Sequence, residues 1–253
     1  MPLIELKNIY KSFGANRVLA GVDLQIDRGE TLVVMGRSGI GKSVTLLIIT
    51  GLLSPDEGQV LIDGQDITTL PERKLISIRR RFSYVFQSGA LFDSLTVAEN
   101  VAFPLYESRQ YESAEITEKV ATILQRLEIE DLADLMPDEI STGMKKRVAI
   151  GRAIAADPVA ILYDEPTTGV DPMSGKMITL LIKELAGKLG VTSVVVTHDL
   201  RCARMIADKV AFIHEGRIYF HDTFERFISS ELDELVHFKR AMPYMMRYIG
   251  VER

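Results

Sequence analysis

The sequence contains no tryptophan and only one cysteine, Cys202. A single cysteine excludes an internal disulfide, so a reducing compartment is expected. The longest apolar run, residues 44–53, is interrupted by polar residues and is shorter than the ~20 residues that a bilayer requires. Residues 1–5 do not begin a secretory signal pattern. Any activity at a membrane would therefore depend on a partner protein.

An excess of positive charge is also lacking, since the formal net charge is −5. Proteins that bind nucleic acid usually carry a basic face, so we expect no nucleic-acid partner. The densest basic run, residues 79–81, is typical of a solvated helix end. With 253 residues, of which 47% are apolar, the chain is long enough for one elaborated α/β domain with a sizeable core.

The most informative stretch is a glycine-rich loop that follows an apolar run and precedes a second one. It has the spacing G-x-x-x-x-G-K-S, in which glycines let successive backbone N–H groups face an anion at a helix N-terminus. The lysine supplies a positive charge for the β- and γ-phosphates of a nucleotide, and the serine hydroxyl is a ligand for Mg²⁺. The residues of this loop are Gly36, Arg37, Ser38, Gly39, Ile40, Gly41, Lys42 and Ser43.

The pattern of the whole chain predicts an α/β fold with a mostly parallel sheet and an N-terminal antiparallel β layer. Helical periodicity replaces strand signals between residues 98 and 157, which indicates a helical subdomain inserted over about residues 88–158. Residues 3–238 form the expected main domain, and residues 223–253 form a C-terminal helical extension that overlaps its end. The predicted strands cover residues 4–9, 22–26, 31–34, 59–64, 82–86, 159–163, 192–197, 209–214 and 217–220.

Four polar residues follow predicted strands, at the edge where open α/β sheets bind ligands. Asp164 is the expected partner of Mg²⁺ and Glu165 the expected general base for an attacking water. Gln87 is predicted to contact metal and water, and His198 to contact the γ-phosphate. A lone histidine after a strand is usually structural, so the assignment of His198 depends on the other three residues.

Taken together, these motifs resemble ATP-binding cassette proteins, whose fold is a P-loop NTPase cassette. The resemblance covers about residues 3–220 and rests on residues 36–43, Gln87, the run 140–144, the run 161–166, residues 169–171 and His198. It implies an ATPase that forms a nucleotide-sandwich homodimer, in which Ser141 and Gly143 of one copy close over the γ-phosphate bound by the other. It further implies that Phe13 stacks on adenine, that Asp171 acts across the dimer interface, and that the region after Gln87 faces a membrane permease.

The run Ile140-Ser141-Thr142-Gly143-Met144 departs from the usual Leu-Ser-Gly-Gly-Gln of that family. A β-branched residue resists positive φ, so Thr142 predicts weaker closure of the sandwich. Met144, together with the runs 86–97, 99–105 and 163–169, is similar to the ATPases of Mce-type lipid transporters, including the maintenance-of-lipid-asymmetry system. That similarity implies transport of phospholipid or another hydrophobic substrate, an Mce-domain protein in the complex, and a peripheral position on the cytoplasmic face of the inner membrane.

Other interpretations remain open at the level of sequence. One is the ATPase of a solute importer, for example of the amino-acid type. Another is a cassette ATPase acting on DNA or ribosomes, although the chain shows no coiled-coil insertion, tandem cassette or basic linker. A third is a binding module without turnover, which the combination of Lys42, Asp164, Glu165 and His198 disfavours. The extension from residue 223 has a modest apolar face that would pack on its own domain or against a partner.

Overall fold

The computed structural model describes residues 2–242 and 246 of the chain. The first half comprises β1 (Pro2–Phe13), β2 (Asn16–Asp27), β3 (Thr31–Met35), α1 (Lys42–Ile49), β4 (Glu57–Ile62), β5 (Gln65–Asp66), α2 (Glu72–Arg79), β6 (Phe82–Val85), α3 (Val97–Ser108) and α4 (Ser113–Arg126). The second half comprises the 3₁₀ turns η1 (Glu130–Leu132) and η2 (Pro137–Glu139), then α5 (Thr142–Ala155), β7 (Ala160–Asp164), α6 (Pro172–Leu189), β8 (Thr192–Val196), α7 (Leu200–Ile206), β9 (Lys209–His214), β10 (Arg217–Asp222), α8 (Phe224–Ser229) and α9 (Asp233–Arg240).

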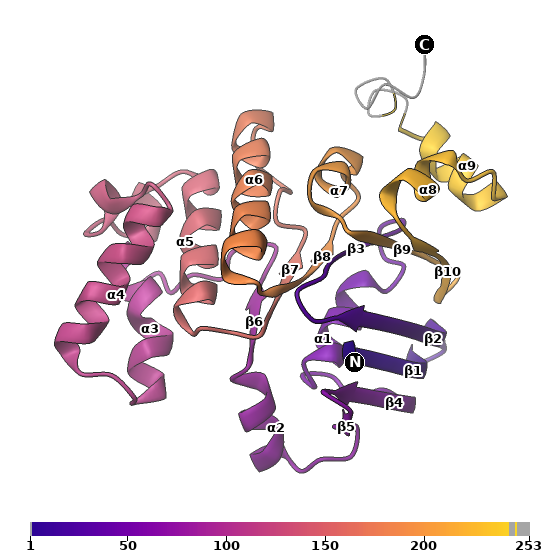
Figure 1. Ribbon diagram of the computed structural model, residues 1–253, viewed down its shortest axis with the longest axis horizontal. Helices are drawn as coiled ribbons and strands as arrows, with labels where there is room; N and C mark the ends of the chain where they lie inside the picture. The colour runs from indigo at the N-terminus through magenta and orange to yellow at the C-terminus, as the bar shows by residue number, and fades with distance from the viewer. Residues whose placement is uncertain (1, 243–245, 247–253) are drawn as a thin grey trace.

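The strands form two sheets that confirm the predicted α/β class. A four-stranded antiparallel sheet has the order β2-β1-β4-β5, and a six-stranded sheet has the order β10-β9-β3-β8-β7-β6. All neighbours in the larger sheet are parallel except β9 and β10. In Figure 1 the antiparallel sheet lies on one side of the larger sheet, and α3, α4 and α5 form a separate lobe on the other.

The central strand β3 is buried along its whole length, as expected of a strand with a neighbour on each side. Alternate side chains point to opposite faces of the sheet and therefore enter different apolar clusters. Leu32 and Val34 pack with the antiparallel sheet and α1, whereas Val33 and Met35 pack with the helices of the other side. The sheet thus holds two cores and fixes the point at which the glycine-rich loop leaves β3.

The parallel pairing explains how distant segments of the sequence meet. β6, β7, β8 and β3 are consecutive neighbours that run in the same direction, so their carboxyl ends share one edge. The glycine-rich loop follows β3, Gln87 follows β6, Glu165 follows β7 and His198 follows β8. The order of the strands therefore places all four segments at the same edge.

The predicted helical subdomain is confirmed, and its first helix begins at Val97, next to residue 98 where helical periodicity is predicted to start. The side chain of Thr96 accepts from the backbone of Glu99, and that of Glu99 accepts from the backbone of Thr96, which closes a capping box at the start of α3. Residues 86–96 form a loop between β6 and α3, next to the edge at which the polar residues gather.

The described part of the C-terminal extension packs on its own domain. Phe227 and Leu235 are fully buried, and the ring of Phe238 lies 4.9 Å from that of Phe212 on β9. Leu232 remains 44% exposed. Residues 243–245 and 247–253 of the predicted extension lie outside the described residues.

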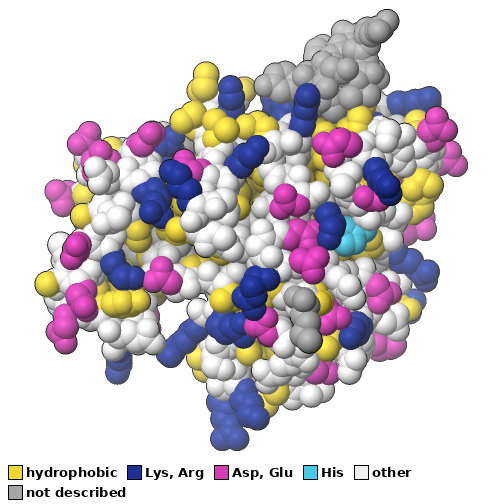
Figure 2. Space-filling view, viewed as in Figure 1, with side chains coloured by type: hydrophobic (Ala, Val, Ile, Leu, Met, Phe, Trp, Pro, Cys, Tyr) yellow, Lys and Arg dark blue, Asp and Glu magenta, His cyan; other side chains and the backbone are white. Residues whose placement is uncertain are grey.

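The outer surface mixes charges of both signs. Figure 2 shows Lys and Arg side chains interspersed with Asp and Glu over the visible face. The basic run at the end of α2 is neutralised locally, because Arg79 pairs with Glu72 and Arg81 pairs with Asp63. Among the described helices, none has the length and apolar character needed to cross a bilayer.

Candidate active site

The glycine-rich loop curls tightly between β3 and α1, as its glycines predict. Gly36 has φ +153°, and a Cβ atom there would lie 2.8 Å from the carbonyl oxygen of Ile213. Gly41 has φ +106°, and a Cβ atom there would lie 2.8 Å from the side chain of Leu19. Gly41 caps α1 without a side-chain hydrogen bond, so the first turn of the helix presents backbone N–H groups to the loop. This arrangement favours an anion.

Lys42 lies within the loop and is only 7% exposed. Its Nζ donates to the carbonyl oxygens of Gly36 and Arg37, each at 3.0 Å, and is 3.8 Å from Glu165 Oε1. Burial lowers the pKa of Lys42, although the charges of Glu165 and Asp164 act in the opposite direction. The ammonium is thus placed where a phosphate bound to the loop would meet it.

Ser43 and Asp164 are joined directly, since Ser43 Oγ donates to Asp164 Oδ1 at 2.8 Å. The second carboxylate oxygen accepts from the hydroxyl of Tyr84 at 3.0 Å. Burial, together with the charge of Asp164, raises the pKa of Tyr84, so this phenol stays protonated and able to donate. A hydroxyl and a carboxylate side by side are the hard oxygen ligands that Mg²⁺ prefers.

The oxygens of Ser43 and Asp164 would supply only part of the ligands that a metal ion needs. The described residues include no group of three or more His, Cys, Asp or Glu side chains arranged for a metal ion. A cation between Ser43 and Asp164 would therefore take its other ligands from phosphate and water, which is how Mg²⁺ is usually held beside a nucleotide. The donor set fits Mg²⁺ bound together with a nucleoside triphosphate.

Glu165 is surrounded by donors. His198 Nδ1 lies 2.9 Å from its Oε2, and Thr168 Oγ1 donates to the same oxygen at 3.1 Å. Burial acts to raise the pKa of Glu165, but the hydrogen bond and charge of His198 and the charge of Lys42 outweigh it and hold the pKa below its usual value. Glu165 also has φ +47°, a conformation that non-glycine residues rarely adopt. The carboxylate is thereby fixed and ionised at neutral pH.

The pairing of His198 with Glu165 predicts a stability that depends on pH. The hydrogen bond that His198 donates to Glu165 raises the pKa of His198 above 6.5, so the pair stabilises the fold fully below that pH and loses the effect as pH rises through the raised pKa. Urea unfolding of the parent and of His198→Gln at pH 6 and pH 9 should show a smaller difference at pH 9. The imidazole is half exposed, so we expect a change of at most about 1 kcal/mol. An equal difference at both pH values would contradict the prediction.

The cavity beside the loop contains most of the residues predicted to bind nucleotide. It has a volume of about 690 Å³, and the end of the C-terminal extension reaches it through Phe238 and Met242. Phe13 stands at its rim, 50% exposed, as the stacking interpretation requires. Of the loop residues only Ile40 is absent from the lining, and its partly buried side chain packs against the apolar core instead. The other predicted residues that line the cavity are Gly36, Arg37, Ser38, Gly39, Gly41, Lys42, Ser43, Gln87, Glu165 and His198.

Three predicted residues lie away from this cavity within the same chain. Ser141 and Gly143 are at the N-terminus of α5, where Ser141 Oγ accepts from the backbone N–H of Met144 at 3.3 Å. Asp171 caps α6 and accepts from the backbone N–H groups of Met173 and Ser174. The structure therefore places none of the three beside the chain's own phosphate loop.

The expectation that Thr142 strains the backbone is wrong. Thr142 is the first residue of α5 and is not among the residues with positive φ. A threonine at that position needs only ordinary helical dihedral angles, which a β-branched residue adopts without strain. The premise for weaker closure is thereby removed.

Sequence reasoning also missed three residues of the site. Tyr84 supports Asp164, Thr168 supports Glu165, and Lys146 on α5 donates from a buried position to the backbone carbonyl of Gln87. Lys146 is 2% exposed. Tyr84 is three residues before Gln87, and Thr168 is three residues after Glu165. This proximity in the sequence could have indicated that both belong to the site. Lys146 comes from the helical subdomain, and nothing in the sequence indicated that it would reach the site.

Comparison with known proteins decides the family. Residues 19–168 match the family described as ABC transporter. The chain belongs to the ABC transporter family. It is an ATPase subunit whose hydrolysis of ATP is coupled to transport, and the predicted cassette fold is thereby confirmed. Relatives differ in their substrates, so the family alone leaves the substrate open.

Two curated relatives of this ABC transporter ATPase are nearly equal in identity. The intermembrane phospholipid transport system ATP-binding protein MlaF of Haemophilus influenzae is 40% identical over 239 residues, which cover 94% of this chain and 90% of that protein. The methionine import ATP-binding protein MetN of Brucella abortus is 39% identical over 217 residues, which cover 86% of this chain and 58% of that protein.

Solved cassettes agree with the fold. The ATP-binding cassette MJ0796, in a dimeric post-hydrolysis state bound to ADP and Pi, has a TM-score of 0.80 and 36% identity, covering 87% of this chain and 98% of that chain. CbiO1 of Clostridium perfringens, part of the transporter complex cbiONQ, has a TM-score of 0.83 and 28% identity, covering 98% of this chain and 97% of that chain.

Proposed function

We propose that this ATPase powers the movement of phospholipid or another hydrophobic substrate across the cell envelope, with a separate membrane permease and an Mce-domain protein. The observation that carries the proposal is the match to MlaF, which covers 90% of that protein, whereas the match to MetN at almost the same identity covers 58% of that protein. Met144 in the signature run supports the same subfamily. The protein would act at the cytoplasmic face of the inner membrane.

In the proposed reaction, Glu165 is the general base that accepts a proton from the attacking water. His198 holds the Glu165 carboxylate at 2.9 Å and donates to the γ-phosphate when ATP is bound. Lys42 and the backbone N–H groups of the loop bind the phosphates, and Phe13 stacks on adenine. Mg²⁺, held by Ser43, Asp164 and Gln87, would neutralise charge on the β- and γ-phosphates.

The functional unit is proposed to be a homodimer in which each copy completes the site of the other. Ser141 and Gly143 lie away from the chain's own phosphate loop, and α5 begins at an exposed N-terminus. A second helix N-terminus directed at the γ-phosphate would add backbone N–H donors and a favourable dipole. Asp171 would contribute from the same face. The solved dimers of MJ0796 support this arrangement.

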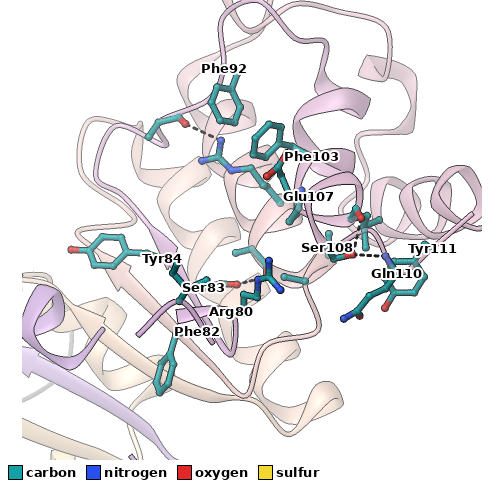
Figure 3. Close-up of a pocket in the computed structure, with 18 of the residues that line it drawn as sticks. Arg80, Phe82, Ser83, Tyr84, Phe92, Phe103, Glu107, Ser108, Gln110 and Tyr111 are labelled. Atoms are coloured by element: carbon teal, nitrogen blue, oxygen red, sulfur yellow. Dashed lines mark hydrogen bonds between the residues drawn. The ribbon is translucent and has the colours of Figure 1, made fainter. Parts of the chain in front are cut away.

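The permease is proposed to dock in an apolar groove between α2, β6 and α3. The groove has a volume of about 690 Å³, and Phe92 and Phe103 lie side by side in it, with ring centroids 4.5 Å apart (Figure 3). It adjoins the loop that carries Gln87, so a segment seated there would reach the nucleotide site through that loop. A short apolar helix of the permease matches its lining.

The groove predicts a variant that separates ATP hydrolysis from coupling. Ile76 lines the groove and is 46% exposed. Ile76→Glu should weaken co-purification with the permease at least tenfold, because the charge would lose solvation in the groove, while the isolated chain keeps its ATPase rate. Leu52→Glu, at a residue 51% exposed outside the groove, is the matched control. Equal recovery of the permease with both variants would rule out this groove.

The substrate is tested by purifying the tagged chain from native membranes in lipid nanodiscs and identifying co-purifying proteins and lipids by mass spectrometry. A permease with an Mce-domain protein and bound phospholipid would support lipid transport. A permease with a receptor for a water-soluble ligand would favour a solute importer, the alternative supported by the 39% identity to MetN. Ribosomal or DNA-repair partners would contradict both.

A further inference from the structure

Lys146 is a buried lysine without a buried counter-ion. It is 2% exposed, and no carboxylate of the described chain lies within ion-pair distance of its Nζ. Its hydrogen-bond partner is a neutral group, the backbone carbonyl of Gln87. Burying an ammonium costs free energy, and a single neutral acceptor offsets little of that cost. A purely structural position would be better filled by an apolar side chain of similar length.

The loop that carries Gln87 is held to α5 at two places. Lys146 donates to the carbonyl of Gln87, and Arg152 donates to those of Gly89 and Ala90 at 2.9 and 2.8 Å. Both donors are on α5, the helix whose N-terminus carries Ser141 and Gly143. The first part of the loop is therefore held by cations of α5, while Asn100 of α3 holds its later part at Phe92.

The ammonium of Lys146 also feels the charges of the reaction centre. Burial lowers the pKa of Lys146, and the charges of Asp164 and Glu165 act against that effect. The hydrogen bond to the carbonyl of Gln87, which follows β6, places the ammonium at the sheet edge where these acids lie. Gln87, whose carbonyl accepts this bond, lines the nucleotide cavity together with Glu165.

We propose that Lys146 is a positioning residue that holds the backbone of Gln87, so that the Gln87 side chain enters the nucleotide cavity only while α5 is correctly placed. This inference rests on the proposed role of Gln87 toward Mg²⁺ and water.

The first test measures the loop without nucleotide. Hydrogen–deuterium exchange of residues 86–92 should accelerate at least tenfold in Lys146→Met, which keeps the length of the side chain but removes its donor. Lys146→Arg should restore most of the protection. Lys119→Met is the matched control, since it removes an ammonium of the same subdomain that bonds to Asp157. Unchanged exchange in a folded Lys146→Met would overturn the proposal.

The second test measures the metal. Mg²⁺ increases the affinity for a fluorescent ATP analogue by some factor in the parent, and we expect that factor to be at least fivefold smaller in Lys146→Met. We also expect kcat to fall at least tenfold while KM changes less than threefold. Lys146→Gln, which keeps a neutral donor, should fall between them and serves if the methionine variant does not fold. A response to Mg²⁺ equal to that of the parent would count against the proposal.

A double variant separates this proposal from the role of Gln87. If Lys146 acts through Gln87, the combination Lys146→Met with Gln87→Ala should be no more impaired than Gln87→Ala alone. Additive losses would show that Lys146 acts independently, which would refute the positioning role. A fully active Gln87→Ala would instead refute the assignment of Gln87, even if the exchange experiment confirms that Lys146 holds the loop.

Discussion

Replacing Glu165 by glutamine should lower the rate of ATP hydrolysis by about 10²–10⁴-fold, the usual contribution of a general base, while ATP still binds. The amide has nearly the shape of the carboxylate and keeps an oxygen for the donors at Thr168 and His198, but it cannot accept a proton. Lys42 would retain its bonds to the loop carbonyls, which do not involve Glu165. Steady-state ATPase assays and equilibrium binding of ATP measure the two effects separately.

The same variant tests the proposed dimer. If hydrolysis opens the sandwich, Glu165→Gln should accumulate as a dimer in the presence of ATP and Mg²⁺, which sedimentation velocity would detect. Glu184→Gln is a suitable control, because it changes an exposed carboxylate that pairs with Lys188 on the same helix, away from the nucleotide cavity. Normal turnover by Glu165→Gln would remove the assignment of the base. Loss of turnover without a dimer would keep the base and contradict the sandwich.

The fold followed from the sequence because its strongest signals agree with one another. Apolar runs that end in Gln87, Asp164 and His198 predict parallel strands with their carboxyl ends at one edge, and the pairing of β6, β7, β8 and β3 places them there. The glycine-rich loop has a spacing that few other structures require. At these residues the sequence pattern of each strand and the order of the strands in the sheet predict the same site.

The parts that sequence did not predict depend on contacts between distant segments. Lys146 reads as one more basic residue on a helix, and only the packing of α5 against the loop buries it beside Gln87. The conformation of Thr142 could not be predicted because its dihedral angles depend on where α5 begins, and Thr142 is already the first residue of that helix. In both cases the deciding fact is the position of α5.

Replacing Lys42 by alanine should weaken ATP binding by about 10–150-fold, which corresponds to the 1.5–3 kcal/mol that a charged hydrogen bond typically contributes. The ammonium is only 7% exposed and already faces the loop, so little ordering is needed when phosphate replaces the carbonyls of Gly36 and Arg37 as its partner. Isothermal titration with ATP and Mg²⁺ measures the change. Lys188→Ala, which removes an exposed ammonium paired with Glu184, is the control and should bind ATP as the parent does.

The loss of Lys42 should also reach Glu165, whose pKa the Lys42 ammonium helps to hold down from a distance of 3.8 Å. Without that charge the carboxylate keeps only His198 and Thr168 as close donors, so its pKa should rise and the acid limb of the ATPase pH profile should move to higher pH. Lys42→Arg keeps the charge and should leave that limb in place even if ATP binds less well. A profile unchanged in Lys42→Ala would mean that His198 alone keeps Glu165 ionised.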